Sequence, residues 1–270
     1  MKLDYVPLLH IQRELQGIPR GMGRFRRYLR TISPDGANLE LPSLLAMNPM
    51  GKDHVTALLD TLLALDADGV AARAVAEALA ELADEPGDFK VALVIVDDLM
   101  GGWTNRYAEE FTHRFQVGPP APADLRLPRW TKHYWVSGIL WSSETASERA
   151  VREAVLTAVY RAAYVQRHGP AGTLRDMLAQ EGCVMARAGC TGPVLDEEDI
   201  AYTREVLSPF LDAQDKRSAI ECLFGDAAGR TLGLTPRGLS LWAGLALALH
   251  DARASEAPHC DSAGVTISPA

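Results

Sequence analysis

Cysteine is scarce in this chain and never occurs as a close pair. The 270 residues contain four cysteines, and none belongs to a C-x-x-C motif. So few cysteines exclude the disulfide framework of small secreted domains and argue against a zinc site built from thiolates. We therefore expect reduced thiols. Cys183 has Arg187 one helical turn later but no histidine at a recognisable spacing, and we interpret it as an inert buried thiol.

Long apolar runs and an excess of positive charge are also missing. The longest apolar segment, residues 239–249, is about half the length of a membrane span, and the N-terminus lacks the apolar core of a signal peptide. The net charge of −8 argues against general binding to nucleic acids or anionic membranes. We therefore expect a soluble, cytoplasmic protein that does not bind membranes, and its wealth of Ala, Arg, Gly and Leu is typical of bacterial chains.

The common catalytic signatures are absent too. The chain has no G-x-S-x-G, no P-loop, no G-x-G-x-x-G and no H-E-x-x-H motif. The sequence therefore gives no motif evidence for the large enzyme classes that these signatures mark.

The sequence does contain regular helical periodicity and the composition of a folded globular protein, with 47% hydrophobic and 23% charged residues. One helix is expected to start near Trp103, after a buried segment. The pattern predicts further helices over residues 6–16, 19–32, 53–65, 69–82, 145–168, 173–180, 196–211, 216–224 and 235–251. The fold class we predict is mainly α (α+β).

Two segments have the composition of β-strands. Residues 91–96 are six successive apolar residues, and residues 133–140 are rich in aromatic and β-branched side chains. A third strand is expected near residues 39–41 or 125–127. We predict a small two- or three-stranded sheet in the middle of the chain.

The expected organisation has three parts. Residues 1–85 read as an N-terminal helical subdomain, and residues 86–251 as a small sheet with a helical bundle, forming one continuous domain with the first part. Residues 252–270 have no apolar face that could pack against a core, and they are expected to be a disordered tail.

Side chains that can bind ligands or transfer protons are concentrated after the first strand. Asp97 and Asp98 end it, and ligands of open sheets lie beyond the carboxyl ends of the strands. On the helix that follows, Arg106, Glu110 and His113 are three or four residues apart and share one face. Glu144 follows the second strand, and a parallel arrangement would bring it to the same edge.

This stretch suggests a function without establishing one. Our first hypothesis is an enzyme acting on a small polar or anionic molecule, in which the loop 117–129 excludes water. The catalytic candidates are Asp97, Asp98, Glu110 and His113, and the substrate-binding candidates are Trp103, Asn105 and Arg106. A divalent metal ion is a candidate cofactor, with Asp98, Glu110 and His113 as its ligands. The plain alternative is that the carboxylates form a turn and a solvated helix face.

A second hypothesis rests on five arginines between Arg20 and Arg30. In an acidic chain they form a segregated basic surface, which either pairs internally or binds a partner. The chain is then a non-catalytic interaction or assembly subunit of a larger complex, and the segment, with the Trp-rich strand, supplies the interface to a protein partner. Whether the chain forms a homo-oligomer is left open.

Overall fold

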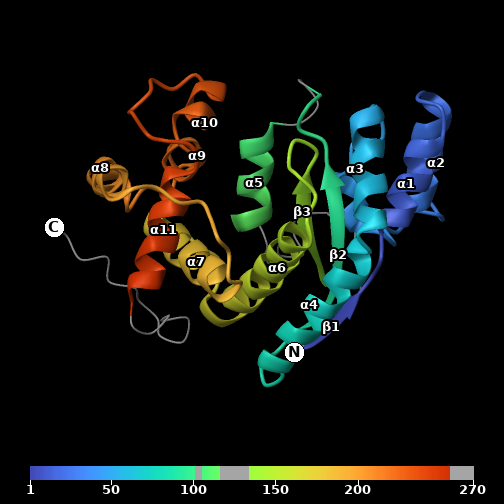
Figure 1. Cartoon of the computed structure of the whole chain (residues 1–270), viewed down its shortest axis with the longest axis horizontal. Coiled ribbons are helices and arrows are strands. Elements are labelled where there is room, and N and C mark those ends of the chain that lie inside the picture. Colours follow the sequence, from blue (N-terminus) through green and yellow to red (C-terminus); the bar gives the residue numbers. More distant parts are fainter. Residues whose placement is uncertain (101–104, 116–133, 256–270) are drawn as a thin grey trace. The chain divides into compact units, whose positions relative to one another are not determined.

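The computed structural model describes residues 1–100, 105–115 and 134–255, and the chain divides into two compact units (Figure 1). The first unit is Met1–Asn105 with Pro119–Ala163, and the second is Arg106–Gly118 with Tyr164–Ala270. The described part contains eleven α-helices, two short 3-10 helices and three strands. The predicted mainly α fold with a small sheet is therefore confirmed. No helix among the described residues is long and apolar enough to cross a membrane.

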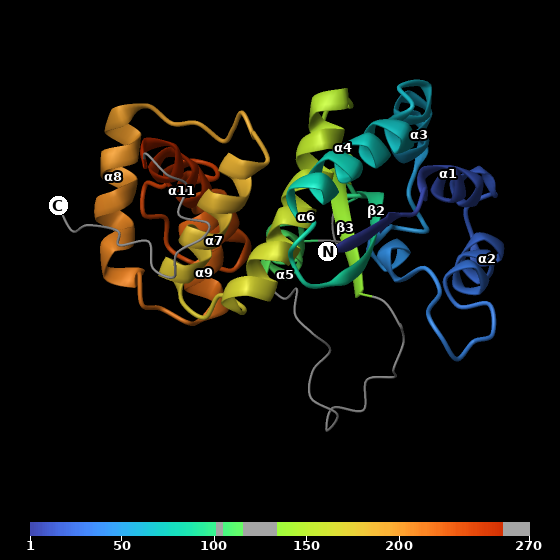
Figure 2. The same cartoon turned by 90° about the horizontal axis from the view of Figure 1, so that it is seen from below.

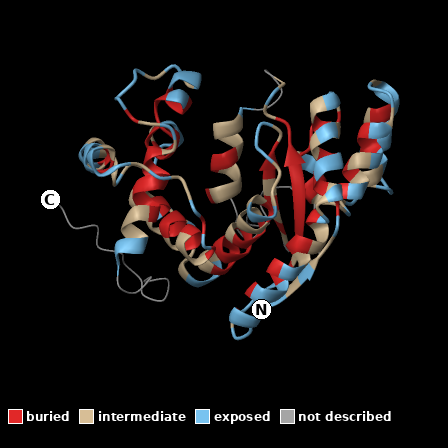
Figure 3. Cartoon of the chain, in the orientation of Figure 1, coloured by how far each residue is buried: buried red, intermediate tan, exposed pale blue. Residues whose placement is uncertain are grey.

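The sheet belongs to the first unit and is parallel throughout. Its strands are β1 (Lys2–Tyr5), β2 (Asp88–Val96) and β3 (Tyr134–Trp141), in the order β1-β2-β3. The register runs from Lys2↔Asp88 along β1 and from Phe89↔Tyr134 to Val96↔Trp141 along β3. Figure 3 shows that β2 is buried along almost its whole length, as expected of the central strand with a neighbour on each side.

One of the two places expected for a third strand is wrong. Residues 39–41 are not a strand, and residues 125–127 lie outside the described part. The third strand is β1, at the N-terminus and not in the middle of the chain. It has only four residues, each exposed or half-buried, so it lacks the long apolar run that revealed β2.

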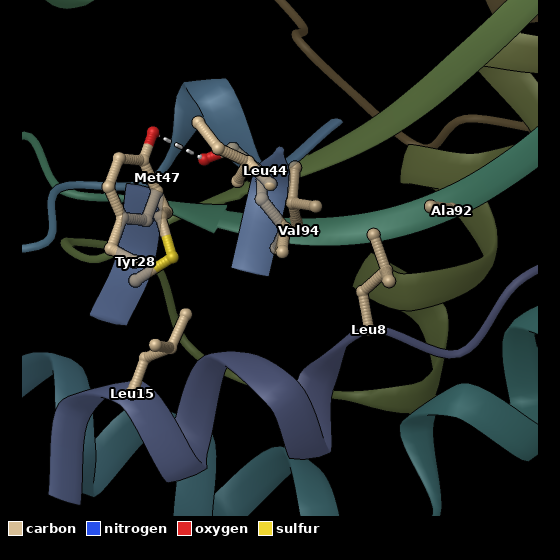
Figure 4. Packing of buried hydrophobic residues seen from close by; sticks show 8 residues of the cluster. Leu8, Leu15, Tyr28, Leu44, Met47, Ala92 and Val94 are labelled. Atoms are coloured by element: carbon tan, nitrogen blue, oxygen red, sulfur yellow. Dashed lines mark hydrogen bonds between the residues drawn. The ribbon is translucent and has the colours of Figure 1, made fainter. Parts of the chain in front are cut away.

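One face of the sheet is covered by α1 (Leu9–Gly17), α2 (Met22–Ile32) and the short 3-10 helix η1 (Pro42–Ala46). Ala92 and Val94 of β2 contribute to the core on this side (Figure 4). The Tyr28 hydroxyl donates a hydrogen bond to the Leu44 carbonyl at 3.2 Å. Eight buried residues form this cluster: Leu8, Leu15, Tyr28, Ile32, Leu44, Met47, Ala92 and Val94.

The opposite face carries α4 (Ala67–Glu81) and the first part of α6 (Glu148–His168), as Figure 2 shows. Gly138 of β3 lets α6 approach closely, since a Cβ atom there would lie 2.9 Å from Cγ1 of Val155. The helix α3 (Asp53–Ala64) packs against α1 and α4. Its first turn reaches the carboxyl end of β2 through His54.

In its described residues, the second unit has only helices as regular secondary structure. It contains α5 (Arg106–Phe115), α7 (Leu174–Arg187), α8 (Glu197–Leu207), η2 (Ser208–Phe210), α9 (Lys216–Phe224), α10 (Asp226–Thr231) and α11 (Ala243–Ala254). The buried helix α11 packs against α7, α8 and α9.

Two expectations for this unit need correction. The helix predicted over residues 235–251 begins only at Ala243, because the preceding loop is held by Asp226, whose carboxylate accepts hydrogen bonds from the backbone N–H groups of Arg237 and Gly238 at 2.9 Å. The helix predicted over 173–180 continues to Arg187. Of the predicted tail over residues 252–270, the first three residues complete α11 and residues 256–270 lie outside the described part.

Candidate functional site

A cluster of polar side chains lies where β2 and β3 end. Asp97 comes directly after β2 and Ser142 directly after β3. Because the two strands are parallel neighbours and Val96 is paired with Trp141, their next residues meet at one edge of the sheet. The Ser142 hydroxyl lies 2.9 Å from Oδ1 of Asp97 and 3.0 Å from Oδ1 of Asp98.

Asp97 is buried, with 1% of its surface exposed, and its carboxylate has several donors. Oδ1 lies 2.8 Å from Nε2 of His54, and Oδ2 accepts a hydrogen bond from Nδ2 of Asn48 at 2.9 Å. Burial alone raises the pKa of such a carboxyl, but the hydrogen bonds from His54, Asn48 and Ser142 outweigh it and hold the pKa of Asp97 below its usual value. Asp97 is therefore an ionised group inside the fold.

His54 connects this buried charge to the surface. It is the second residue of α3, and 28% of its side chain is exposed. Its Nε2 faces Asp97, and among the described residues no hydrogen bond engages its Nδ1. A carboxylate that accepts the N–H of one ring nitrogen leaves the lone pair of a neutral imidazole on the other. In the neutral ring, the accepting lone pair of His54 therefore lies on Nδ1.

Asp98 binds the turn that follows β3. Its Oδ1 accepts the backbone N–H of Ser143 at 3.0 Å, and its Oδ2 accepts the Ser143 hydroxyl at 2.6 Å. The Asp98 backbone N–H donates to the Ser142 hydroxyl at 3.1 Å. Asp98 thus joins the ends of β2 and β3 and lies beside the Asp97 carboxylate.

The loop before α3 is held in place by a chain of buried amides. Oδ1 of Asn48 accepts the backbone N–H of Met50 at 2.8 Å, and the Asn48 carbonyl accepts Nε2 of Gln16 at 2.9 Å. Arg24 donates to Oε1 of Gln16 at 2.7 Å and to the Gly51 carbonyl at 2.9 Å. Arg24 therefore pairs internally, and it supports the loop that presents Asn48 to Asp97.

The predicted residues of α5 lie in the second unit, where they form a charged network. Nε of Arg114 lies 2.8 Å from Oε2 of Glu110, and Nη1 of Arg114 lies 2.5 Å from Oε2 of the fully buried Glu181. Arg106 lies 3.9 Å from Glu110 and over the ring of Trp242. Arg106 and Glu110 therefore take part in packing within this unit.

The predicted site is divided between the two units. Asp97, Asp98 and the exposed Asn105 belong to the first, whereas Arg106, Glu110 and His113 belong to the second, in which Nε2 of His113 lies 4.0 Å from Glu109. The proposed metal ligands Asp98, Glu110 and His113 span the two units, and this set stays a prediction. Within the described residues no group of three or more His, Cys, Asp or Glu side chains could hold a metal ion. Trp103 and the loop 117–129 lie outside the described residues.

Sequence reasoning missed four residues of the cluster: Asn48, His54, Ser142 and Ser143. The two serines follow the predicted second strand and could have been found by the argument that singled out Glu144, which is exposed one residue later. Asn48 and His54 carried no local signal, because they reach Asp97 across 49 and 43 residues of sequence.

One expectation about the thiols is wrong. Cys183 is disulfide-bonded, so it is neither a reduced thiol nor a nucleophile. Cys190 and Cys222 are buried and are not disulfide-bonded, as expected of inert cysteines. Burial raises the pKa of Cys222 to about 12, which keeps this thiol protonated.

No protein-family model, curated protein sequence or solved structure matches the chain.

Proposed function

We propose that the protein is an enzyme that moves protons on a small polar molecule, with His54 as the acid–base group. The single observation that supports this proposal is the pairing of a half-buried histidine with a buried, ionised aspartate at the carboxyl end of a parallel strand. General acid–base catalysis needs a proton acceptor that reaches the solvent side and is held in one orientation. His54 meets both requirements.

Asp97 is the positioning residue in this proposal. A buried carboxylate on one ring nitrogen selects the tautomer of the histidine and stabilises the imidazolium that forms when the other nitrogen takes a proton. Asn48 and Ser142 hold the carboxylate from two further sides. The geometry therefore persists without a bound substrate.

The charge of the cluster limits the substrate. Two adjacent carboxylates, Asp97 and Asp98, repel an anionic group and attract hydrogen-bond donors. We infer a substrate that carries hydroxyl or amino groups, which narrows the class of small polar or anionic molecules suggested by the sequence. Asp98 and Ser143 are the side chains that would contact it, since both lie at the same strand ends.

The test is to incubate the purified full-length protein with an extract of polar small molecules in D2O and to follow all masses by mass spectrometry. We expect at least one hydroxyl- or amino-bearing compound to be consumed, formed or labelled with deuterium at a carbon atom, where hydrogen does not exchange readily without a catalyst. In His54→Gln this rate falls by about 100-fold or more, because proton transfer by a positioned side chain contributes about 100- to 10,000-fold. His10→Gln, at an exposed position of α1, is the matched control and should react like the wild type.

A second measurement separates the positioning role of Asp97 from a merely structural one. Nitrogen-detected NMR of the His54 ring reports its tautomer. Asp97→Asn should change this tautomer while the protein stays folded. If His54→Gln reacts as fast as the wild type, or if Asp97→Asn leaves the His54 ring unaffected, the proposal is wrong.

The assembly role remains the second candidate, and one observation favours it. The side chains of Arg20, Arg26, Arg27 and Arg30 are exposed, and no ion pair within the described residues engages them. The Trp-rich strand contributes less than expected to such an interface, because Trp141 is buried in the first unit.

A further inference from the structure

The outer side of α2 combines positive charge with apolar surface. Arg26, Arg27 and Arg30 are exposed, and beside them Met22 is 60% and Leu29 43% exposed. We call these five residues the arginine face. The arginine side chains form no hydrogen bond or ion pair with any residue that the structure describes.

Neighbouring sequence does not neutralise this charge. No acidic residue occurs between Glu14 and Asp35, although the whole chain has a net charge of −8. Arg24, on the inner side of the same helix, is buried and donates to backbone carbonyls. The helix therefore uses one arginine for the fold and leaves three on its surface without a counter-charge from any described residue.

A surface of complementary character lies on α8. Glu198, Tyr202 and Glu205 are exposed and follow one another at intervals of four and three residues, which places them on one side of the helix. We call these three residues the acidic face. The two glutamate side chains have no partner within the described part of the chain. The Tyr202 hydroxyl donates to the Arg237 carbonyl at 2.6 Å, which fixes the ring with 43% of the residue exposed.

We propose that the arginine face of one molecule binds the acidic face of a second copy of this chain. The two faces match in length, since helical rise separates Met22 from Arg30 by about 12 Å and Glu198 from Glu205 by about 10 Å. The two faces are opposite in charge. Each also has an apolar part, formed by Met22 and Leu29 on α2 and by the Tyr202 ring on α8. Aromatic side chains and arginines are enriched at protein interfaces.

Such a contact joins two different surfaces. If both faces of a molecule engage the same partner, the contact closes a two-fold dimer, and if they engage different partners, it builds rings or open chains. Two short helix faces cover less than the roughly 800 Å² per partner of a standard interface, so the association is weak and depends on concentration. Its charged part weakens with salt, because the screening length falls from about 10 Å at 0.1 M to about 3 Å at 1 M. None of these residues belongs to the His54 cluster, and this interaction is independent of the proposed catalytic function.

Sedimentation velocity of the full-length protein over a range of concentrations at low salt tests the interaction. We expect the wild type to form species larger than the monomer and to lose them at 1 M salt. Arg26→Glu with Arg30→Glu should remain monomeric, and so should Glu198→Arg with Glu205→Arg. The matched control, Arg149→Glu with Arg230→Glu, makes the same charge change at exposed arginines elsewhere and should associate as the wild type does.

Mixing the two monomeric variants provides the sharpest result. In the mixture, the reversed α2 of one variant meets the reversed α8 of the other, and the unaltered faces also remain complementary. The mixture should therefore form larger species although neither variant does so alone. A mixture that stays monomeric would overturn the proposal, as would a wild type that stays monomeric at every concentration.

Another outcome would assign the arginine face to a different partner. If the monomeric wild type sediments with vesicles of anionic phospholipid and Arg26→Glu with Arg30→Glu does not, α2 binds an anionic surface and self-association is refuted.

Discussion

Nε2 of His54 lies 2.8 Å from Oδ1 of Asp97, and this contact joins the first turn of α3 to the carboxyl end of β2. The aspartate is buried and the histidine is half-buried. The pair therefore couples a charge inside the protein to a proton acceptor near its surface. It is the structural basis of the proposed acid–base function.

The lowered pKa of Asp97 makes a prediction about pH. A carboxyl whose pKa is lower in the folded than in the unfolded state stabilises the fold above its usual pKa of 3.8, and this stabilisation is lost as the pH falls through the folded value. We expect Asp97→Asn to be less stable than the wild type at pH 7, and the difference to narrow as the pH falls below about 4. Urea denaturation between pH 3 and pH 7 measures both. A difference that does not change with pH would contradict the ionised state of Asp97.

Gln12 supports the strand that presents Asp97. Its Oε1 accepts the Ile95 N–H at 3.0 Å and its Nε2 donates to the Ile95 carbonyl at 3.2 Å, beyond the point where β1 has ended. Gln12→Ala leaves both buried backbone groups without a partner, and each such group costs about 1–3 kcal/mol. We expect a marked loss in the free energy of unfolding, measured by urea denaturation. Glu14→Ala, at an exposed position of the same helix, is the control and should change it little.

Arg24 and Arg27 lie on the same helix, but we expect their replacement by alanine to affect the stability of the fold differently. Nε of Arg24 donates to the Ile18 carbonyl at 2.6 Å, and its two terminal nitrogens bond Gln16 and Gly51. Arg24→Ala removes these donors from buried carbonyls, and we expect it to destabilise the fold by at least about 2 kcal/mol. Arg24→Lys should recover only part of this, because an ammonium group cannot reproduce the planar fork. Arg27→Ala should leave the denaturation midpoint unchanged, and equal effects at both positions would contradict the structure.

Gly138 tests how closely α6 packs on β3, and Gly23 in α2 is the uncrowded control. A Cβ atom at Gly138 would lie 2.9 Å from Cγ1 of Val155 and 3.1 Å from the backbone of Ala154. We expect Gly138→Ala to destabilise the fold by about 1–3 kcal/mol, as overpacking does. Gly23→Ala meets no atom within 4 Å in α2 and should stabilise the helix by about 0.5–1 kcal/mol. Thermal denaturation followed by circular dichroism distinguishes the two signs.

How much of the structure could be predicted depends on whether a feature is local. The run from Val91 to Val96 marks a buried strand by composition alone, and helical periodicity found most helices, because both reflect which side chains avoid water. The short edge strand β1 escaped notice because pairing with β2, rather than its own residues, makes it a strand. The start of α11 was misplaced because Asp226 holds the loop before it from outside that segment.

The order of residues along the chain is enough to predict a mainly helical protein around a buried strand that ends in two carboxylates. Hydrophobic periodicity and turn residues act within a few positions of one another, so the linear order of residues is enough to read them. Which side chains meet those carboxylates depends on how distant segments pack against each other. His54 and Asn48 reach Asp97, and Gln12 reaches Ile95, through hydrogen bonds that form only after distant segments have packed. A hydrogen bond depends on the distance and direction between two groups in space, and the spacing of residues along the chain predicts neither.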